Sequence, residues 1–269
     1  MNGSPPAVWV TRPREQALRL EALLREHGFE PVAAPLLAIE PIEDETKEAQ
    51  VAAALDDYAW VFFVSRSAAE LAVPRLRRYR AWPPGPPVMT VGEGSAASLR
   101  DLGFAEVVFP RQGADSEAVL ALPECARAAV SGRRVLIVKG EGGRALLAQT
   151  LTERGASVDT WICYRRIRPQ WSDEVLAPLR ERRLAAMLLT SSEGAGNLPE
   201  LVPAADWPRL AEIPAVAAHP RIAAAALALG LKRVVTAPAP GDAGLVAALE
   251  SLPVFQELTL VLQKVQISP

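Results

Sequence analysis

The sequence predicts an α/β protein with two similar lobes, each built on a doubly wound parallel sheet of the flavodoxin type. Two observations lead to this prediction. Short apolar runs of strand length alternate along the chain with amphipathic segments of helical period. The alternation repeats once, in the same order, at an offset of 126 or 127 residues. Because strand–helix alternation gives parallel strands with helices on both faces of the sheet, a repeated alternation indicates an internal duplication.

The repeat is clearest between the start of the chain and residues 133–168. The apolar run at residues 135–138 (VLIV) repeats the run at residues 8–11 (VWVT). Gly155 lies as far from Gly28 as Val135 lies from Val8, which is 127 positions. Each copy therefore reads as a buried strand, a polar strand end, an amphipathic helix ended by glycine, and a second strand.

The other elements follow the same order in both halves. Strands are expected at residues 8–10, 31–42, 60–64, 88–91 and 107–109, and again at 135–138, 158–168, 186–190, 215–218 and 234–236. Helices are expected at about 15–27, in the latter part of 43–57, at 68–76, up to Leu102, and around 245–252, with a further helix capped by Ser116.

Two proline-marked strands, residues 31–42 and 158–169, occupy equivalent places in the copies, and proline suits a strand at a sheet edge. If both strands pass between the lobes, each lobe contains parts of both copies. We therefore expect one lobe at 1–37 with 171–269, and the other at 43–165. A two-stranded linker at about 36–42 and 163–170 would join them.

Composition limits the class of protein. The chain has 269 residues, is 50% hydrophobic and 22% charged, and has a net charge of −2, which predicts a soluble globular protein and argues against a general nucleic-acid binder. Only Cys125 and Cys163 are present, so neither a disulfide framework nor a zinc site is expected, and a cytoplasmic location fits. The apolar stretch at 215–231 is interrupted by His219 and Arg221, which argues against a membrane span.

Polar residues at the strand ends are the candidates for ligand binding, because ligands of parallel α/β sheets bind beyond the carboxyl ends of the strands. Hydroxyls, glycines and arginines at helix starts suit an anion such as a carboxylate or a phosphate, although the same residue types also serve as caps and turn formers. The candidate strand ends are Thr11-Arg12, residues 65–67 (SRS), 92–95 (GEGS), 139–144 (KGEGGR), Ser191-Ser192 and 219–221 (HPR).

Several well-defined motifs are absent. The sequence has no P-loop and no GxSxG nucleophile elbow, and residues 92–97 (GEGSAA) only weakly imitate a dinucleotide fingerprint. His27 and His219 have no Cys, Asp or Glu at ligand spacing, so a metal site is not expected. His27 instead lies in the last turn of a helix, where a structural role against the helix dipole is expected.

Tyr164 is one of only three tyrosines and lies on the second proline-marked strand. A phenol there could donate a proton or a hydrogen bond to a leaving group. The same side chain could instead pack a hinge between the lobes, and the residues alone leave both possibilities open.

Several short signatures occur along the chain in a fixed order. They are residues 10–13 (VTRP), 63–65 (FVS), 91–92 (VG), 139–140 (KG) with Arg144, Tyr164, 189–194 (LTSSEG) and 218–220 (AHP). With these signatures the chain resembles the uroporphyrinogen-III synthases over about residues 7–250. The resemblance implies two α/β lobes joined by a two-stranded ladder, in a monomeric enzyme without a cofactor.

Members of that family act on hydroxymethylbilane, a linear tetrapyrrole with eight carboxylates. The resemblance implies loss of the terminal hydroxyl as water, followed by ring closure with inversion of the last pyrrole through a spiro intermediate. Because the substrate closes unaided to the non-inverted isomer, catalysis would consist largely of positioning the substrate between the lobes. The alternative is a non-catalytic two-lobed binding protein for a small polyanion.

The resemblance also implies roles for individual residues. Tyr164 matches a tyrosine thought to assist departure of the hydroxyl, Ser65 and Ser191 match serines of the cleft, and Arg144 matches a residue available to the carboxylates. The complete set expected to bind substrate is Thr11, Arg12, Ser65, Arg66, Gly92, Arg144, Ser191, His219 and Arg221.

The match departs from the family pattern in two places. Many members have glycine in place of His219 and threonine near Ile222, so Arg221 is a candidate substitute for the hydroxyl contact. The tail at residues 253–269 lies outside the resemblance, and its apolar residues suit either a packed helix or a surface for a partner.

Overall fold

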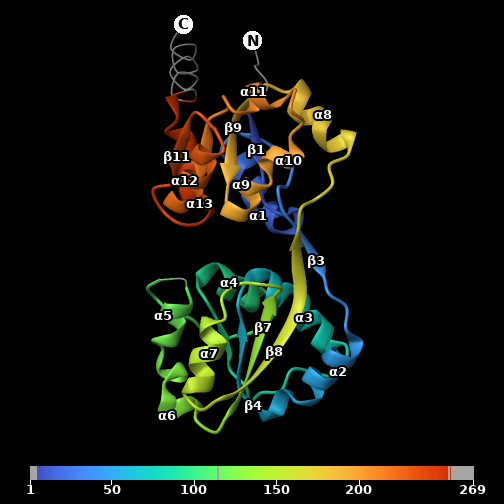
Figure 1. The fold of residues 1–269 in the computed structure, drawn as a ribbon, viewed down its shortest axis with the longest axis vertical. Helices are drawn as coiled ribbons and strands as arrows, with labels where there is room; N and C mark the ends of the chain where they lie inside the picture. Colours follow the sequence, from blue (N-terminus) through green and yellow to red (C-terminus); the bar gives the residue numbers. More distant parts are fainter. Residues whose placement is uncertain (1–4, 114, 254, 256–269) are drawn as a thin grey trace, which may run out of the picture. The chain divides into compact units, whose positions relative to one another are not determined.

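A computed structural model describes residues 5–113, 115–253 and 255. The chain divides into two compact units. Unit 1 takes the chain up to Ala38 and from Ile167 onward, and unit 2 takes Ile39–Arg166. Each unit has its own sheet with helices on both faces, and the strand pairs β1–β2, β1–β9, β9–β10, β10–β11, β4–β5, β4–β7, β5–β6 and β7–β8 are all parallel (Figure 1). The predicted α/β class with parallel sheets is confirmed.

Unit 1 contains a five-stranded sheet. From one edge to the other the strands are β11 (Val234–Thr236), β10 (Ala215–Ala217), β9 (Leu184–Leu189), β1 (Ala7–Val10) and β2 (Glu30–Ala33). One face packs against α1 (Arg14–Glu26) and α13 (Asp242–Glu250). The other face packs against α8 (Asp173–Glu181), α9 (Ser192–Gly196), α10 (Leu198–Leu201), α11 (Trp207–Leu210) and α12 (Pro220–Ala228).

Unit 2 contains most of a six-stranded sheet. Its strand order is β3 (Ala38–Pro41), β8 (Ser157–Ile167), β7 (Arg134–Gly140), β4 (Tyr58–Phe63), β5 (Val88–Thr90) and β6 (Val107–Val108). The helices on one face are α2 (Glu45–Ala53), with the 3₁₀ turn Leu55–Asp57, α3 (Arg66–Arg77) and α4 (Glu93–Asp101). The other face carries α5 (Ser116–Leu120), the 3₁₀ turn Pro123–Cys125, α6 (Arg127–Val130) and α7 (Leu146–Glu153).

The central strand β4 buries apolar side chains on both faces of the sheet, because helices cover both faces. In β4, Val61 and Phe63 belong to the core under α2, α3 and α4. Trp60 and Phe62 alternate with them and belong to the core under α5, α6 and α7. All four side chains are at most 3% exposed, so β4 contributes to a hydrophobic core on each face of the sheet.

Glycine ends the helices where the sequence predicted it. Gly28 follows α1 with φ +79° and Gly155 follows α7 with φ +91°, a left-handed backbone that glycine adopts without strain. The N–H of Gly28 donates to the carbonyl of Arg25, and the N–H of Phe29 donates to that of Leu24. These two bonds form a Schellman motif, which satisfies carbonyls that the end of α1 would otherwise leave unpaired.

Two sequence predictions need correction. The extended segment expected at 31–42 is two strands, β2 and β3, with Pro35 in the break between them. The N-cap of α5 is Asp115 and not Ser116, because the Asp115 carboxylate accepts the N–H of Ala118 at 2.8 Å and Ser116 is already the first helical residue.

The ends of the chain are only partly described. In the tail expected to pack or to meet a partner, Phe255 contacts Phe29 edge to face at 5.0 Å between ring centroids. Residues 254 and 256–269 lie outside the described residues. Among the helices of the described ranges, none is both long and apolar enough to cross a membrane.

Asp159 provides a pH-dependent contribution to stability. It accepts hydrogen bonds from Arg134 at 2.6 Å and from Tyr58 at 2.8 Å. Burial acts to raise the pKa of Asp159, but the two hydrogen bonds together with the positive charges of Arg134 and Lys47 lower it below its usual value. A carboxyl whose pKa is lower in the folded state stabilises the fold above its unfolded pKa, and the contribution is lost as pH falls through the folded pKa.

We therefore expect Asp159→Asn to lower the free energy of unfolding at pH 7 by about 1 kcal/mol, a value discounted for the partial exposure of the pair. The difference should shrink as the pH falls, because the carboxyl of the folded wild type then becomes protonated. Urea unfolding at pH 7 and pH 3 measures both values, and a difference that does not change with pH would contradict the assigned cause.

Candidate active site

Tyr164 lies at the carboxyl edge of the unit 2 sheet. It pairs in register with Gly140, the last residue of β7, while its own strand continues to Ile167. Its side chain is only 1% exposed. Its hydroxyl lies 2.9 Å from the Oγ of Ser65, which follows β4 after a single residue, Val64. Parallel pairing thus brings together two residues that are 99 positions apart in the chain.

Gly140 makes room for the tyrosine ring. A Cβ atom added at Gly140 would lie 2.4 Å from Cζ of Tyr164 and 2.9 Å from its hydroxyl oxygen. Only a residue without a side chain allows the ring to lie this close to the strand, which gives a physical reason for the glycine of the KG signature. The sequence placed Gly140 in the candidate strand end 139–144, but Gly140 was not in the set of residues expected to bind substrate.

Arg166 also contacts Tyr164 and so joins Tyr164 and Ser65 in one cluster. The sequence did not predict Arg166 as a site residue. Its Nη2 donates to the Tyr164 hydroxyl at 3.2 Å, and its guanidinium carbon lies 5.5 Å from the centroid of the tyrosine ring. Residues two apart on a strand share a face of the sheet, so the position of Arg166 relative to Tyr164 was an available signal.

Ser65 is the N-cap of α3. Its Oγ accepts the N–H of Ala68 at 3.1 Å, and the side chain is half-buried. Arg66 begins the helix, and its guanidinium lies 3.6 Å from where a Cβ on Gly94 would be, so it reaches the start of the neighbouring α4. Gly92 is the N-cap of α4 and has an extended backbone, which other residues can also adopt.

Among the contacts of the described residues, none joins Arg144 to Tyr164, Ser65 or Arg166. It is 59% exposed and forms a two-pronged ion pair with Glu117 of α5, at 2.6 and 2.9 Å. The hydrogen bond from Arg144 lowers the pKa of Glu117 and raises the pKa of Arg144. The guanidinium therefore already has an anionic partner, and an incoming carboxylate would have to bind beside Glu117 or compete with it.

In unit 1, the two residues after β1 are fixed by contacts within that unit. Thr11 is buried, and its hydroxyl donates to the carbonyl of Leu188 in β9. Arg12 forms an ion pair with Asp242, the first residue of α13, at 2.9 Å, and both side chains are mostly buried. The structure therefore shows these residues joining the end of β1 to neighbouring elements, a role that sequence reasoning did not assign.

Ser191 and His219 cap the helices that follow β9 and β10. The Oγ of Ser191 accepts the N–H of Gly194 at 3.2 Å, and Nδ1 of His219 accepts the N–H of Arg221 at 3.2 Å. Since Nδ1 is an acceptor here, the neutral imidazole carries its proton on Nε2, and that atom remains able to donate. His219 and Arg221 are exposed, whereas Ile222 points into the core.

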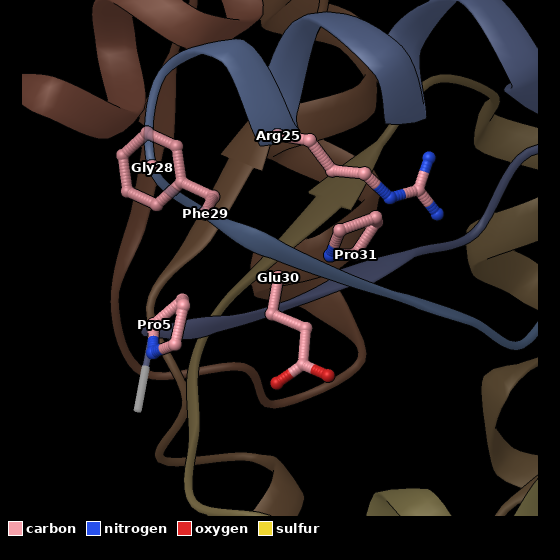
Figure 2. Close-up of a pocket in the computed structure, with 6 residues that line it drawn as sticks. All are labelled: Pro5, Arg25, Gly28, Phe29, Glu30 and Pro31. Atoms are coloured by element: carbon pink, nitrogen blue, oxygen red, sulfur yellow. The ribbon is translucent and has the colours of Figure 1, made fainter. Parts of the chain in front are cut away.

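A shallow hollow elsewhere in unit 1 does not belong to this set. It lies between the end of α1 and the start of β2 and is lined by Pro5, Arg25, Gly28, Phe29, Glu30 and Pro31 (Figure 2). Glu30 and Pro5 mark the amino ends of the strands, opposite to the edge that carries Thr11 and Ser191. In Figure 2 the Arg25 side chain extends to the right and the Glu30 side chain extends downward, so the two charged groups do not converge on a ligand.

Comparison with known proteins gives the family. The sequence model of uroporphyrinogen-III synthase HemD matches residues 19–247, which is most of the chain. The chain belongs to the uroporphyrinogen-III synthase family. It is 31% identical over 200 residues to the uroporphyrinogen-III synthase of Escherichia coli, covering 73% of this chain and 80% of that protein. The enzyme of Salmonella typhimurium is also 31% identical, over 199 residues that cover 73% of this chain and 80% of that protein.

Solved uroporphyrinogen-III synthases have the same fold. A mutant of the Thermus thermophilus enzyme superposes with a TM-score of 0.54 at 15% identity, covering 94% of this chain and 99% of that one. The Helicobacter pylori protein gives the same TM-score and identity, covering 96% of this chain and 99% of that one. At this identity the likeness concerns the fold alone, so the roles of single residues depend on the contacts within this chain.

Proposed function

We propose that this protein is a uroporphyrinogen-III synthase, which closes hydroxymethylbilane into uroporphyrinogen III with loss of water and inversion of the last pyrrole ring. The observation that carries the proposal is the family match over residues 19–247. The Escherichia coli relative bears the same enzyme name at 31% identity, over 80% of its own length. The protein is thus a lyase of porphyrin and haem biosynthesis.

The proposed chemistry needs no cofactor. The reaction removes the elements of water and rearranges carbon–carbon bonds of the substrate, so it has no net oxidation or reduction. What the protein must supply is a proton for the departing hydroxyl and control over the folded shape of the tetrapyrrole. A cluster of hydroxyls at the sheet edge with an arginine beside it suits both tasks.

We propose Tyr164 as the acid that assists departure of the hydroxyl. Its contact with Ser65, its close packing on Gly140 and the hydrogen bond from Arg166 support a fixed and functional phenol. The residues proposed to bind the substrate are Thr11, Arg12, Ser65, Arg66, Gly92, Arg144, Ser191, His219 and Arg221. Of these, Thr11 and Arg12 would act by holding their loop, because their side chains are already bound to Leu188 and Asp242.

We further propose that the fold arose by internal duplication. Matching β11, β10, β9, β1 and β2 of unit 1 with β6, β5, β4, β7 and β8 of unit 2 gives the same strand order. An irregularity in strand register recurs in the same place, next to Ala7 in the β1–β9 pair and next to Tyr58 in the β4–β7 pair. Gly103 and Gly230, also 127 positions apart, end α4 and α12 with the same left-handed turn.

The proposed lobes are residues 1–37 with 171–269, and residues 43–165, with the chain passing between them at about 36–42 and 163–170. The division of the chain into two compact units near Ala38 and Ile167 supports these boundaries. We also propose that the protein acts as a cytoplasmic monomer that does not bind nucleic acid. The net charge of −2 supports the last point.

Product analysis tests the proposed function. Hydroxymethylbilane generated in situ would be incubated with the protein, the products oxidised, and the porphyrin isomers separated by chromatography. We expect the type III isomer to dominate, and only type I in a control without protein. A folded sample that yields only type I would overturn the enzyme assignment and favour the alternative, a binding protein for a small polyanion.

A further inference from the structure

Three side chains form a hydrogen-bonded row at the carboxyl edge of the unit 2 sheet. Arg166 Nη2 lies 3.2 Å from the Tyr164 hydroxyl oxygen, and that oxygen lies 2.9 Å from Ser65 Oγ. The tyrosine in the middle is only 1% exposed, whereas Ser65 is half-buried. A ligand beyond the sheet edge can therefore reach the serine hydroxyl more readily than the phenol.

The direction of the protons follows from the chemistry of the groups. A guanidinium can only donate, so the tyrosine oxygen accepts a hydrogen bond from Arg166. Among the contacts of the described residues, Ser65 Oγ is the one acceptor within reach of the tyrosine proton. If Ser65 donated to the tyrosine instead, a buried O–H would be left without a partner, which is unfavourable because its hydration is lost and not replaced.

Ser65 continues the row of hydrogen bonds from Tyr164. Its Oγ accepts from the N–H of Ala68 at 3.1 Å and from Tyr164, which occupies both acceptor positions of the hydroxyl. The serine proton is then left to point away from both groups. The row runs from Arg166 through Tyr164 to Ser65, and each donor strengthens the next because hydrogen bonds in a chain polarise one another.

We propose that Ser65 is the catalytic hydroxyl that meets the departing oxygen of the substrate, and that Tyr164 and Arg166 act through it as a proton source and a positioning residue. This inference rests on the proposed function and refines the role given there to Tyr164. It assigns Ser65 a chemical step where the family resemblance implied only a lining residue.

The step balances without a further reactant. The bond between carbon and the terminal hydroxyl breaks, and its electron pair goes to oxygen. The lone pair of the pyrrole nitrogen stabilises the electron-deficient carbon that is left. The oxygen takes the proton of Ser65 and leaves as water, and Ser65 takes the phenolic proton of Tyr164. The phenolate is stabilised by the charge-assisted hydrogen bond from Arg166. When ring closure later releases a proton from carbon, the same row returns it to Tyr164.

The test is a double-mutant cycle on kcat for type III product. Ser65→Ala and Tyr164→Phe should each lower kcat ~100-fold, the range of general acid catalysis. The double variant should lie within about threefold of the lower single variant, because residues that act as one unit are not additive. Ser65→Thr keeps a hydroxyl and an N-cap, and should restore kcat to within about tenfold of the wild type.

Two controls separate chemistry from structure. Asp44→Ala removes another N-cap of unit 2, where the Asp44 carboxylate accepts the N–H of Lys47 at 2.8 Å, and should leave kcat unchanged. This variant is the control for Ser65→Ala.

The second control belongs to a test of Arg166. Arg166→Gln should lower kcat about tenfold with KM unchanged, because Arg166 acts on the phenol and not on the bound substrate. Arg165→Gln removes a charge from the same strand on the opposite face, where Arg165 pairs with Glu40, and should leave both constants unchanged.

Two results would overturn the relay. One is a Ser65→Ala variant within about threefold of the wild-type kcat beside an impaired Tyr164→Phe variant, because the phenol would then meet the substrate directly. The other is a double variant whose loss is the product of the single losses. In both cases the wild type still forms the type III isomer, so the proposed function survives. A wild type that forms only type I overturns the proposed function and the relay with it.

Discussion

Replacing Gly140 by alanine is expected to lower kcat for type III product ~100-fold, the cost of displacing a reacting group by about 1 Å. The added Cβ would lie 2.4 Å from Cζ and 2.5 Å from Cε2 of Tyr164, closer than such atoms approach in real proteins. The ring cannot yield easily, because it is buried and its hydroxyl is held by Ser65 and Arg166. The hydroxyl must therefore leave its present position.

Stability should change less than activity in this variant. Overpacking of a buried site costs about 1–3 kcal/mol, which urea unfolding would measure beside the kinetic assay. Gly85→Ala is a matched control, because a Cβ there meets no atom within 4 Å, and it should change neither quantity. In the double variant Gly140→Ala with Tyr164→Leu, the smaller side chain should restore stability but not turnover.

Full activity in a folded Gly140→Ala variant would contradict the proposal that Gly140 fixes the position of the Tyr164 hydroxyl. It would mean that the position of the phenol does not matter for turnover, and the proposed functions of Tyr164 and of the row that contains it would both fail. Loss of activity that follows loss of folded protein would not meet the prediction either, because the expected result is a folded and slow enzyme.

The features that the sequence predicted are those with a local cause. Gly28 and Gly155 were identified as helix ends because a left-handed residue after a helix has a strong preference for glycine, and both positions have positive φ. The buried strands were recognisable because their apolar runs reflect helices on both faces of a sheet. Ser116 was misplaced by one residue because aspartate and serine both serve as N-caps, and the sequence does not say which of two neighbours begins the turn.

The contacts of the candidate site depend on strand register, which the sequence does not specify. Tyr164 faces Gly140 because the pairing of β7 with β8 shifts between Lys139 and Gly140, and without this shift another residue would lie against the glycine. Arg12 meets Asp242 across 230 positions, so neither residue could be assigned a partner from local pattern. Strand ends could be listed from sequence, but the partners of their side chains needed the fold.

The site also shows why hydroxyl and arginine residues at strand ends are ambiguous in a sequence. Ser65 and Ser191 are both N-caps that accept a backbone N–H, which is the structural role such residues commonly have. Only Ser65 has a buried tyrosine hydroxyl within hydrogen-bond distance among the described contacts. The two serines thus have the same place after a strand and the same capping role. They differ because β8 places Tyr164 beside Ser65.

Removal of the Glu48 carboxylate is expected to cause the largest loss of stability, about 3 kcal/mol for Glu48→Ala, as found when one partner of a buried ion pair is deleted. Glu48 is only 1% exposed and lies in α2. It pairs with Arg75 at 3.3 Å and with Arg78 at 2.8 Å, both in or next to α3. The Arg75 side chain is 11% exposed, so without the carboxylate its charge stays buried, with the hydrogen bond to the carbonyl of Ile42 as its remaining contact among the described residues.

Urea unfolding measures this loss, and three further variants define its cause. Asp56→Ala breaks the exposed pair with Arg80 and should cost at most about 0.5 kcal/mol. Glu48→Gln keeps the volume and one acceptor, so its loss should be smaller than that of Glu48→Ala. The double variant Glu48→Ala with Arg75→Met should recover part of the loss, since removing both charges removes the buried unpaired one. If Glu48→Ala cost no more than Asp56→Ala, the docking of α2 on α3 would depend on its apolar contacts through Val51 and Ala52 and not on this carboxylate.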